Sequence, residues 1–340
     1  MRQLPAAKAN GVTMQEIAER AGVSAMTVSR ALRDPDSVSG AALERVRTAI
    51  RETGYVANRL AGSLSSRRSN VIGLILPGIN DSLYAGTVKA ISDVLRGRGF
   101  HLMITDTGLL PNAEEEAVAA FLGQRVCGLI LYNTKHTSRT EALIRSAGIP
   151  TIEVGNLLKR PLDSCVSYSS FAAAKAMTVH LGRLGYRRIG FVSLPRQDND
   201  RAAERTLGYF AGLKELGLPE DPAIAMETQS GFAGGAHAVV RLLEIDPAID
   251  AIFFAADVMA VGALFECQRR GWNVPERVAI ASFDNVDLLR HVVPSITTLR
   301  IPREEIGKRS AELLLDRLNG QAGLPSIVDL GFEVIQRDST

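Results

Sequence analysis

The chemistry-bearing side chains of this 340-residue chain form none of the common catalytic motifs. No GxSxG, HExxH, Walker A or GxGxxG pattern is present, and the five histidines lack metal-ligand spacing. Two aspartates remain of interest, because Asp257 follows the apolar run AIFFAA and Asp284 follows VAIASF. They could act as an acid–base pair or accept hydrogen bonds from the hydroxyl groups of a ligand. We predict no metal and no cofactor.

A second group of polar and basic side chains lies in the stretch 13–39, TMQEIAERAGVSAMTVSRALRDPDSVS. Thr13 precedes Glu16 by three residues, which is the capping-box spacing, and Gly22 is placed to end the first helix. Ser24 should cap a second helix, which a proline-containing turn ends. The pattern predicts a helix-turn-helix, whose second helix lies in the DNA major groove. A generic pair of helices has the same turn spacing and stays open as an alternative.

The second helix separates its side chains into two faces. We expect Val28, Ala31 and Leu32 to face inward. The outward Arg30 can bind O6 and N7 of guanine through two hydrogen bonds, although it could also be a solvated surface arginine. Hydroxyl and amide side chains suit phosphate contacts, which position a protein without reading sequence. The expected DNA-binding residues of this kind are Thr13, Thr27, Ser29 and Asn58, and Arg33 is expected to bind DNA as well.

A third helix is expected at 40–53, with Leu43 and Val46 on its apolar face. After it comes the polar segment NRLAGSLSSRR, which is too short to hold a helix alone. It could fold if DNA and a second copy of the chain supplied contacts. We therefore expect a disordered arm at 1–12, a DNA-binding domain at 13–55 and a hinge at 56–70.

The segments AGVSAMTVSRAL, GYVANRLAGSLSSRRS and VIGLILPGIN together resemble the lactose-repressor (LacI/GalR) family of transcription regulators. Their order and spacing agree with that family, and the resemblance covers essentially the whole chain. It implies that Ala25 and Met26 occupy the two positions that choose among operator sequences. It also implies that Leu64 is the hinge leucine inserted between base steps in the minor groove, unless it packs on Leu60 instead.

Charge is distributed unevenly along the chain. The whole chain carries +2, whereas residues 1–70 hold eleven basic and six acidic side chains, a balance of 11 − 6 = +5. A basic amino-terminal part on a mildly acidic body suits phosphate neutralisation. DNA is therefore the expected macromolecular partner, with no membrane partner.

The compartment follows from cysteine usage and apolar runs. Cys127, Cys165 and Cys267 are far apart in apolar surroundings, which predicts buried thiols in a reducing cytoplasm. The first residues, MRQLPAAKAN, lack an apolar signal core, and the longest apolar run contains aspartates. We expect a cytoplasmic, nucleoid-associated protein rather than a secreted solute-binding protein.

From residue 71 onward, apolar strands alternate with amphipathic helices, which predicts parallel sheets covered on both faces. The pattern runs through two similar sets, the second of which includes a helix expected at 205–216, and a last helix is expected at 303–318. The expected fold is an all-α helix-turn-helix head joined to an α/β, periplasmic-binding-protein-like body of two doubly wound lobes. We place the first lobe at about 71–165 and 300–325, and the second at about 166–299 and 326–340.

The family resemblance implies an effector site in the cleft between these lobes. Arg205 stands three residues before Gly208, at the place of the family's effector-binding arginine. Asp257 could equally cap its own helix, and Asp284 could be a turn residue. The positions that match family ligand sites are Asn80, Tyr84, Thr105, Thr107, Tyr168, Arg205, Gln229, Asp257, Phe283 and Asp284.

Two departures from the family pattern bear on the effector. Ala256 replaces an asparagine common in relatives, and Ser169-Ser170 replaces a common Asp-Asn pair. The segments HTSRTEALIRSAGIPTIEV, GALFECQRRGWNVPE and VDLGFEVI resemble the gluconate-utilisation repressors of the family. An arginine can bind a carboxylate through two hydrogen bonds, and aspartates accept them from hydroxyls. We therefore expect an aldonic or keto-aldonic acid.

The predicted function is a ligand-responsive, non-enzymatic DNA-binding regulator. It is expected to be a homodimer that represses a sugar or sugar-acid (gluconate-like) catabolic operon and leaves its palindromic operator when effector binds. A corepressor-dependent regulator of the same fold, a cytoplasmic carbohydrate-binding protein and a carbohydrate-active enzyme remain as alternatives.

Overall fold

The computed structural model describes residues 12–55, 69–79 and 82–340. The chain divides into two compact units, residues 1–69 and 70–340, each described here by itself. Residues 1–11 of the expected arm, and within the hinge Asn58 and Leu64, fall outside the described residues, as does Asn80.

Residues 12–55 of the first unit form three α-helices, α1 (Met14–Ala21), α2 (Ala25–Arg33) and α3 (Gly40–Thr53). A 3₁₀ turn, η1 (Pro35–Ser37), follows α2. Ile17 of α1, Val28 of α2 and Val46 of α3 are almost completely buried and form the centre of a small core. Leu32, expected to face inward, is instead 40% exposed, whereas its neighbour Ala31 is buried in this core.

The second unit begins with a parallel six-stranded sheet in the order β11-β5-β4-β3-β1-β2. Side chains along its strands point alternately to the two faces of the sheet. Because β1 and β3 are apolar on both faces, helices cover both. Helices α5 and α12 pack together on one face, and α6 and α7 pack on the other. Its elements are β1 (Val71–Leu76), η2 (Ser82–Tyr84), α5 (Ala85–Gly97), β2 (His101–Asp106), α6 (Pro111–Gly123), β3 (Gly128–Leu131), α7 (Ser138–Ala147), β4 (Thr151–Glu153), β5 (Ser164–Ser167), α12 (Arg303–Leu318) and β11 (Ile327–Asp329).

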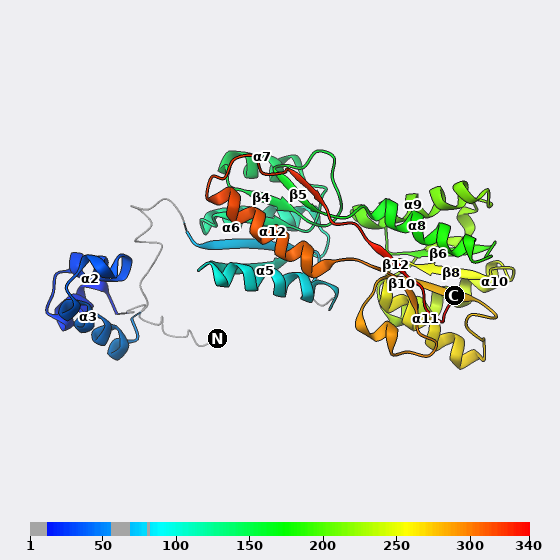
Figure 1. The fold of residues 1–340 in the computed structure, drawn as a ribbon, viewed down its shortest axis with the longest axis horizontal. Helices are drawn as coiled ribbons and strands as arrows, with labels where there is room; N and C mark the ends of the chain where they lie inside the picture. The colour runs from blue at the N-terminus through cyan, green and yellow to red at the C-terminus, as the bar shows by residue number, and fades with distance from the viewer. Residues whose placement is uncertain (1–11, 56–68, 80–81) are drawn as a thin grey trace, which may run out of the picture. The chain divides into compact units, whose positions relative to one another are not determined.

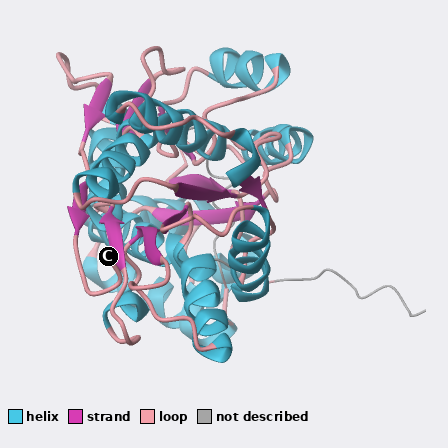
Figure 2. Cartoon of the chain, turned by 90° about the vertical axis from the view of Figure 1, so that its right-hand side faces the viewer, coloured by secondary structure: helices cyan, strands magenta, loops and turns pink. Residues whose placement is uncertain are grey.

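The second lobe repeats this plan around a sheet in the order β12-β10-β9-β8-β6-β7. Only the edge strand β12 is antiparallel, where it pairs with β10. Helices α8 and α9 pack together, as do α10 and α11, and the helices surround the strands in Figure 2. Its elements are α8 (Ser170–Arg183), β6 (Ile189–Ser193), α9 (Asp200–Leu216), η3 (Pro222–Ile224), β7 (Ala225–Glu227), α10 (Phe232–Ile245), β8 (Ala251–Phe254), α11 (Asp257–Arg270), β9 (Ala279–Asp284), η4 (Asp287–Arg290), β10 (Thr297–Arg300) and β12 (Glu333–Ile335).

The chain passes between the two lobes three times, after β5, after β10 and after β11. The last two passages are the orange and red segments of Figure 1. The first and last of the three lobe boundaries lie a few residues later than the expected ones. β5 extends to Ser167 in the first sheet, and β11 at 327–329 also joins that sheet beside β5, so the final crossing follows residue 329 rather than 325. The reason is that residues 327–329 pair in parallel with 165–167 of β5, a tertiary contact that the short strand's own sequence does not reveal.

The apolar segments behave as their sequence predicts. Cys127, Cys165 and Cys267 are buried free thiols. Within the described part of the chain, no helix has both the length and the hydropathy needed to cross a membrane.

Candidate DNA-binding and ligand-binding sites

The turn between α1 and α2 has the expected helix-turn-helix geometry. The Thr13 hydroxyl accepts a hydrogen bond from the Glu16 amide, and the Glu16 carboxylate accepts one from the Thr13 amide at 2.7 Å. Gly22 has φ of 60°, in the left-handed region that favours glycine, and ends α1. The Ser24 hydroxyl accepts from the Thr27 amide at 3.1 Å and so caps α2. These caps fix where the exposed face of α2 begins.

That exposed face carries the side chains expected to read DNA. Met26 is 66% exposed, Arg30 is exposed, and Ala25 and Ser29 are half-buried. Thr27 is also half-buried, and its hydroxyl lies 2.9 Å from that of Ser24. Thr13 is exposed at the start of α1, and Arg33 is the last residue of α2.

The net positive charge of residues 1–70 comes from residues outside the three helices. Residues 12–55 contain six basic and six acidic side chains, so they are neutral overall. The five remaining basic residues lie in the arm and the hinge, and they are Arg2, Lys8, Arg59, Arg67 and Arg68. Most of the nonspecific attraction to phosphates must therefore come from the segments that flank the helices.

A cavity lies between the two lobes of the second unit, beyond the carboxyl ends of the strands of both sheets. Ligands in open α/β sheets bind at this edge, since the connecting loops supply the polar groups. Three arginines line the cavity, Arg201 and Arg205 from α9 and Arg303 from the start of α12. The other lining residues are Leu83, Tyr84, Leu109, Tyr132, Ser193, Leu194, Asn199, Ala202, Ser230, Ala255, Ala256 and Asp284.

Arg205 is held by contacts on several sides. Its guanidinium donates to the Ala255 carbonyl oxygen at 2.6 Å and to the Tyr168 hydroxyl at 3.0 Å. Its Cζ lies 3.7 Å from the centroid of the Phe283 ring, a cation–π contact. Tyr168 and Phe283, both expected at the site, thus contact Arg205 from below the cavity surface and fix its direction.

Arg201 reaches from the second lobe into the first. Its Nη1 donates to the Tyr132 carbonyl oxygen at 2.9 Å. Glycine at position 155 makes room for this contact, because a Cβ there would lie 1.8 Å from that oxygen and 2.7 Å from Arg201 Nη1. Nearby, the rings of Tyr84 and Tyr132 meet edge to face at 4.7 Å.

Asp284 and Arg303 form a buried ion pair at the cavity, and Arg303 also donates to the Tyr132 hydroxyl at 2.9 Å. The attraction of Asp284 raises the pKa of Arg303 above its usual value, against the effect of burial. Asp284 and Asn285 have φ of 106° and 61°. Such backbone strain in residues other than glycine concentrates at ligand-binding positions.

Asp257 is buried beneath the cavity rather than in its wall. Its carboxylate accepts from the Val286 amide at 2.7 Å and from the hydroxyls of Ser282 and Thr298. Burial raises its pKa, and the nearby charge of Asp284 raises it further. The residue therefore connects the start of α11 to β9 and β10.

Three other expected residues also lie outside the cavity wall. Thr107 is buried and donates to the Leu76 carbonyl oxygen at 3.3 Å, while Thr105 is half-buried on the edge strand β2. Leu109 lines the cavity in their place, because Gly108 and Leu109 both have positive φ and turn the chain inward. Gln229 is exposed, and its neighbour Ser230 lines the cavity.

The residues that sequence reasoning missed are Arg201, Arg303 and Tyr132. A signal existed for the first, since Arg201 and Arg205 are four residues apart and share a helix face. Helix α9 begins at Asp200, capped by the Asn199 side chain, whereas we expected its start at Arg205. Arg303 comes from a segment that crosses between the lobes, so its placement depends on the tertiary fold.

A helix-turn-helix reader joined to a two-lobed body with an interlobe cavity defines a class of protein, the ligand-responsive DNA-binding transcription regulators. Residues 13–58 match the family described as bacterial regulatory proteins, lacI family, and residues 178–340 match the periplasmic binding protein-like domain. A relative in Pseudomonas aeruginosa, the HTH-type transcriptional regulator GntR, is 36% identical over 96% of this chain and 95% of its own length. The chain belongs to the lacI family of transcription regulators.

Solved structures agree with this assignment. A transcriptional regulator of the same family from Silicibacter pomeroyi is 30% identical and superposes with a TM-score of 0.88, covering 96% of this chain and 99% of that one. A complex of the transcriptional regulator CelR with cellobiose is also 30% identical, with a TM-score of 0.71 and the same two coverages. The predicted fold class and regulatory function are therefore confirmed.

Proposed function

We propose that this regulator is a repressor whose effector is a sugar acid bound in the interlobe cavity. The observation that carries the proposal is a set of buried polar atoms on the cavity-lining residues. Ser193 Oγ, Arg205 Nε and Arg303 Nε have no hydrogen-bond partner among the described residues. Buried polar groups are nearly always satisfied, so three in one cavity favour a ligand rich in acceptors.

Charge favours an anion over a neutral sugar. Arg201, Arg205 and Arg303 are opposed by Asp284 in the cavity wall and by Asp200 beside Arg201, a balance of 3 − 2 = +1. The raised pKa of Asp257 keeps that group from adding a full negative charge. One carboxylate on a polyol would neutralise the excess, and its two oxygens suit the guanidinium groups. An aldonic or keto-aldonic acid such as D-gluconate meets both requirements.

The geometry favours binding over catalysis. An acid–base pair must reach the reacting atoms, yet Asp257 is occupied by three donors beneath the cavity and Asp284 is paired with Arg303. We therefore propose that the protein is not an enzyme. The cellobiose complex of CelR is an example of a relative that binds a sugar.

We also propose a homodimer that reads a palindromic operator, one half-site for each head. An exposed apolar patch on the second lobe suits a second copy of the chain. It consists of Phe232, Phe265 and Val293, which are 50%, 40% and 79% exposed. The two rings lie 6.3 Å apart, and Gln268, one turn along α11, donates to the Val293 carbonyl oxygen, which brings residue 293 beside this helix. A lac repressor structure is itself described as a dimer bound to operator.

The proposed effector is tested by thermal unfolding with a matched pair of ligands. D-gluconate and D-glucitol have the same carbon chain, but only gluconate carries a carboxylate. A ligand that binds only the native state stabilises it by about 2.7 kcal/mol at one hundred times its dissociation constant. We expect gluconate to raise the melting temperature by several degrees and glucitol to leave it unchanged. An equal rise with glucitol would contradict the sugar-acid proposal.

An experiment with operator DNA tests whether the effector weakens or strengthens DNA binding. We expect gluconate to lower operator affinity, and linkage requires operator to lower gluconate affinity by the same factor. An increase in operator affinity would instead identify a corepressor.

A further inference from the structure

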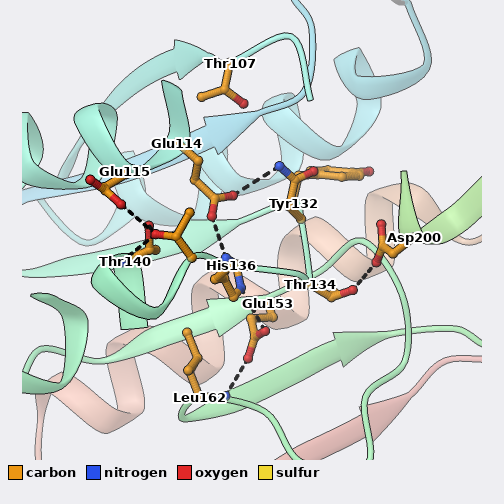
Figure 3. Close-up of polar contacts among 12 residues, drawn as sticks. Thr107, Glu114, Glu115, Tyr132, Thr134, His136, Thr140, Glu153, Leu162 and Asp200 are labelled. Carbon is orange, nitrogen blue, oxygen red and sulfur yellow. Dashed lines mark hydrogen bonds and ion pairs between the residues drawn. The ribbon is translucent and has the colours of Figure 1, made fainter. Parts of the chain in front are cut away.

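A buried cluster of three ionisable side chains lies in the first lobe, outside the cavity. It joins Glu114 of α6, His136 of the segment after β3, and Glu153 of β4, as Figure 3 shows. His136 Nδ1 lies 2.5 Å from Glu114 Oε1, and its Nε2 lies 3.1 Å from Glu153 Oε1. All three side chains are at most 3% exposed, so water does not screen these contacts.

The second oxygens of both carboxylates are also bonded. Glu114 accepts from the Asn133 amide at 3.1 Å, and Glu153 accepts from the Leu162 amide at 2.6 Å. Two hydrogen bonds from the imidazole ring require that both its nitrogens carry protons. Burial alone would lower the pKa of His136, but the two carboxylates raise it to about 9. The imidazole between these two side chains therefore carries a positive charge at neutral pH.

The surrounding charged groups do not compete for this cation. Glu115 of α6 accepts from the Thr137 hydroxyl and pairs with Arg139 of α7. Asp163 accepts from the Thr151 amide and pairs with Arg317 of α12. Each nearby carboxylate thus has its own partners, which leaves Glu114 and Glu153 to bind His136.

The cluster holds a segment that reaches the other lobe. Residues 132–137 run from the end of β3 to the start of α7, with His136 and Asn133 bonded into the first lobe. Two other residues of this segment contact the second lobe. The Thr134 hydroxyl donates to Asp200, and the Tyr132 carbonyl accepts from Arg201. Asp200 and Arg201 begin α9, the helix that presents Arg205 to the cavity.

We propose that Glu114, His136 and Glu153 are positioning residues for the cavity, which fix segment 132–137 so that Tyr132 and Thr134 meet the first turn of α9. Because the His136 imidazole is bonded to carboxylates on α6 and β4, segment 132–137 is held in one position. A hydrophobic contact, which has no preferred direction, would let the segment shift. The cluster thereby sets where α9, and with it Arg205, stands against the first lobe. Its relevance to effector binding rests on the function proposed above.

The test uses hydrogen–deuterium exchange on the free full-length protein, so that its outcome does not depend on the effector. The variant His136→Gln removes the cation. The matched control is His180→Gln, because His180 is a half-buried histidine of α8 whose Nε2 has no partner among the described residues. Thr134→Val removes the contact with Asp200 and leaves the cluster intact.

We expect His136→Gln at pH 7 to raise exchange about tenfold in residues 199–206 as well as in 132–137, since local opening sets the exchange rate. In the wild type, the same increase should develop, after correction for intrinsic rates, as pH rises through about 9. Thr134→Val should raise exchange at 199–206 at every pH. The control His180→Gln should leave exchange unchanged in both segments.

Faster exchange confined to 132–137 would overturn the proposal, because the cluster would then stabilise only its own lobe. Unchanged exchange at 199–206 in Thr134→Val would overturn it as well, and this variant remains informative if His136→Gln does not fold. Failure of gluconate to bind would contradict the proposed effector without affecting either result.

Discussion

Asp284 and Arg303 form an ion pair that joins the two lobes of the ligand-binding unit. Asp284 ends β9 of the second lobe, and Arg303 begins α12, which packs on α5 of the first. The side chains are 3% and 11% exposed. Because the same guanidinium also donates to the Tyr132 hydroxyl, one buried cation connects a strand end from each sheet.

Asp284→Asn should destabilise the protein by about 3 kcal/mol, since removing one partner of a buried pair leaves the other charge unpaired. Asparagine tolerates positive φ, so the φ of 106° at this position adds little further strain. Urea unfolding measures the change. Asp287→Asn is the control, because that side chain is 78% exposed and its loss should change stability by less than about 1 kcal/mol. Equal effects of the two substitutions would show that the buried pair contributes no more than a surface one.

Much of the fold could be predicted from local sequence signals. Helices α3 and α12 have the expected bounds, Gly40–Thr53 and Arg303–Leu318. For α3 the Ser39 cap and Gly54, with φ of 65°, mark the two ends. Helix α9 begins five residues earlier than the sequence predicts, since the polar run RQDNDRAAE is equally typical of a loop. Only the Asn199 cap and the burial of Arg201 in the assembled fold show that the helix begins at Asp200.

The candidate site was predictable where a strand end or helix face determined a residue's position. Tyr84, Arg205 and Asp284 line the cavity as expected. Thr107 and Gln229 do not, because the final direction of a loop depends on turns such as the one at Gly108. The His136 cluster joins residues 17 and 22 positions apart, and no local pattern identifies such a contact.

Arg205→Lys should weaken gluconate binding at least tenfold while leaving operator affinity unchanged in the absence of effector. A hydrogen bond to a charged group contributes about 1.5–3 kcal/mol, and lysine cannot reproduce the planar guanidinium. Isothermal titration measures the first quantity and a gel-shift titration the second. Lys214→Ala, an exposed cation near the end of α9, is the control and should change neither. Normal gluconate affinity in Arg205→Lys would show that the effector binds elsewhere.

Arg30→Ala should reduce specific operator binding by about 1–3 kcal/mol if its guanidinium contacts a base edge. Arg47→Ala removes the same charge from α3, where Arg47 pairs with Glu44 on the surface. We expect that control to weaken specific and nonspecific binding equally. Fluorescence anisotropy with operator and scrambled duplexes separates the two effects. An equal loss on both duplexes in Arg30→Ala would assign this side chain to phosphate contact.

Phe265→Glu should convert the proposed dimer to monomers, because it places a charge in the apolar patch formed with Phe232 and Val293. Sedimentation velocity reads the oligomeric state directly. Leu207→Glu is the matched control, since Leu207 is 57% exposed on α9, away from the patch. A dimer that survives Phe265→Glu would place the interface on another face of the molecule.

The raised pKa of His136 makes stability depend on pH in a defined direction. The pKa is 6.5 in the unfolded chain and about 9 in the folded one, so the folded state holds the proton more tightly. The contribution is fully present below pH 6.5 and is lost as pH rises through 9. A shift of this size corresponds to about 3 kcal/mol, most of which should disappear between pH 7 and pH 10. Because other groups titrate in the same range, the measurement is the difference between the wild type and His136→Gln in urea unfolding across these pH values. That difference should shrink as pH rises, and a constant difference would mean that His136 is neutral in the folded protein.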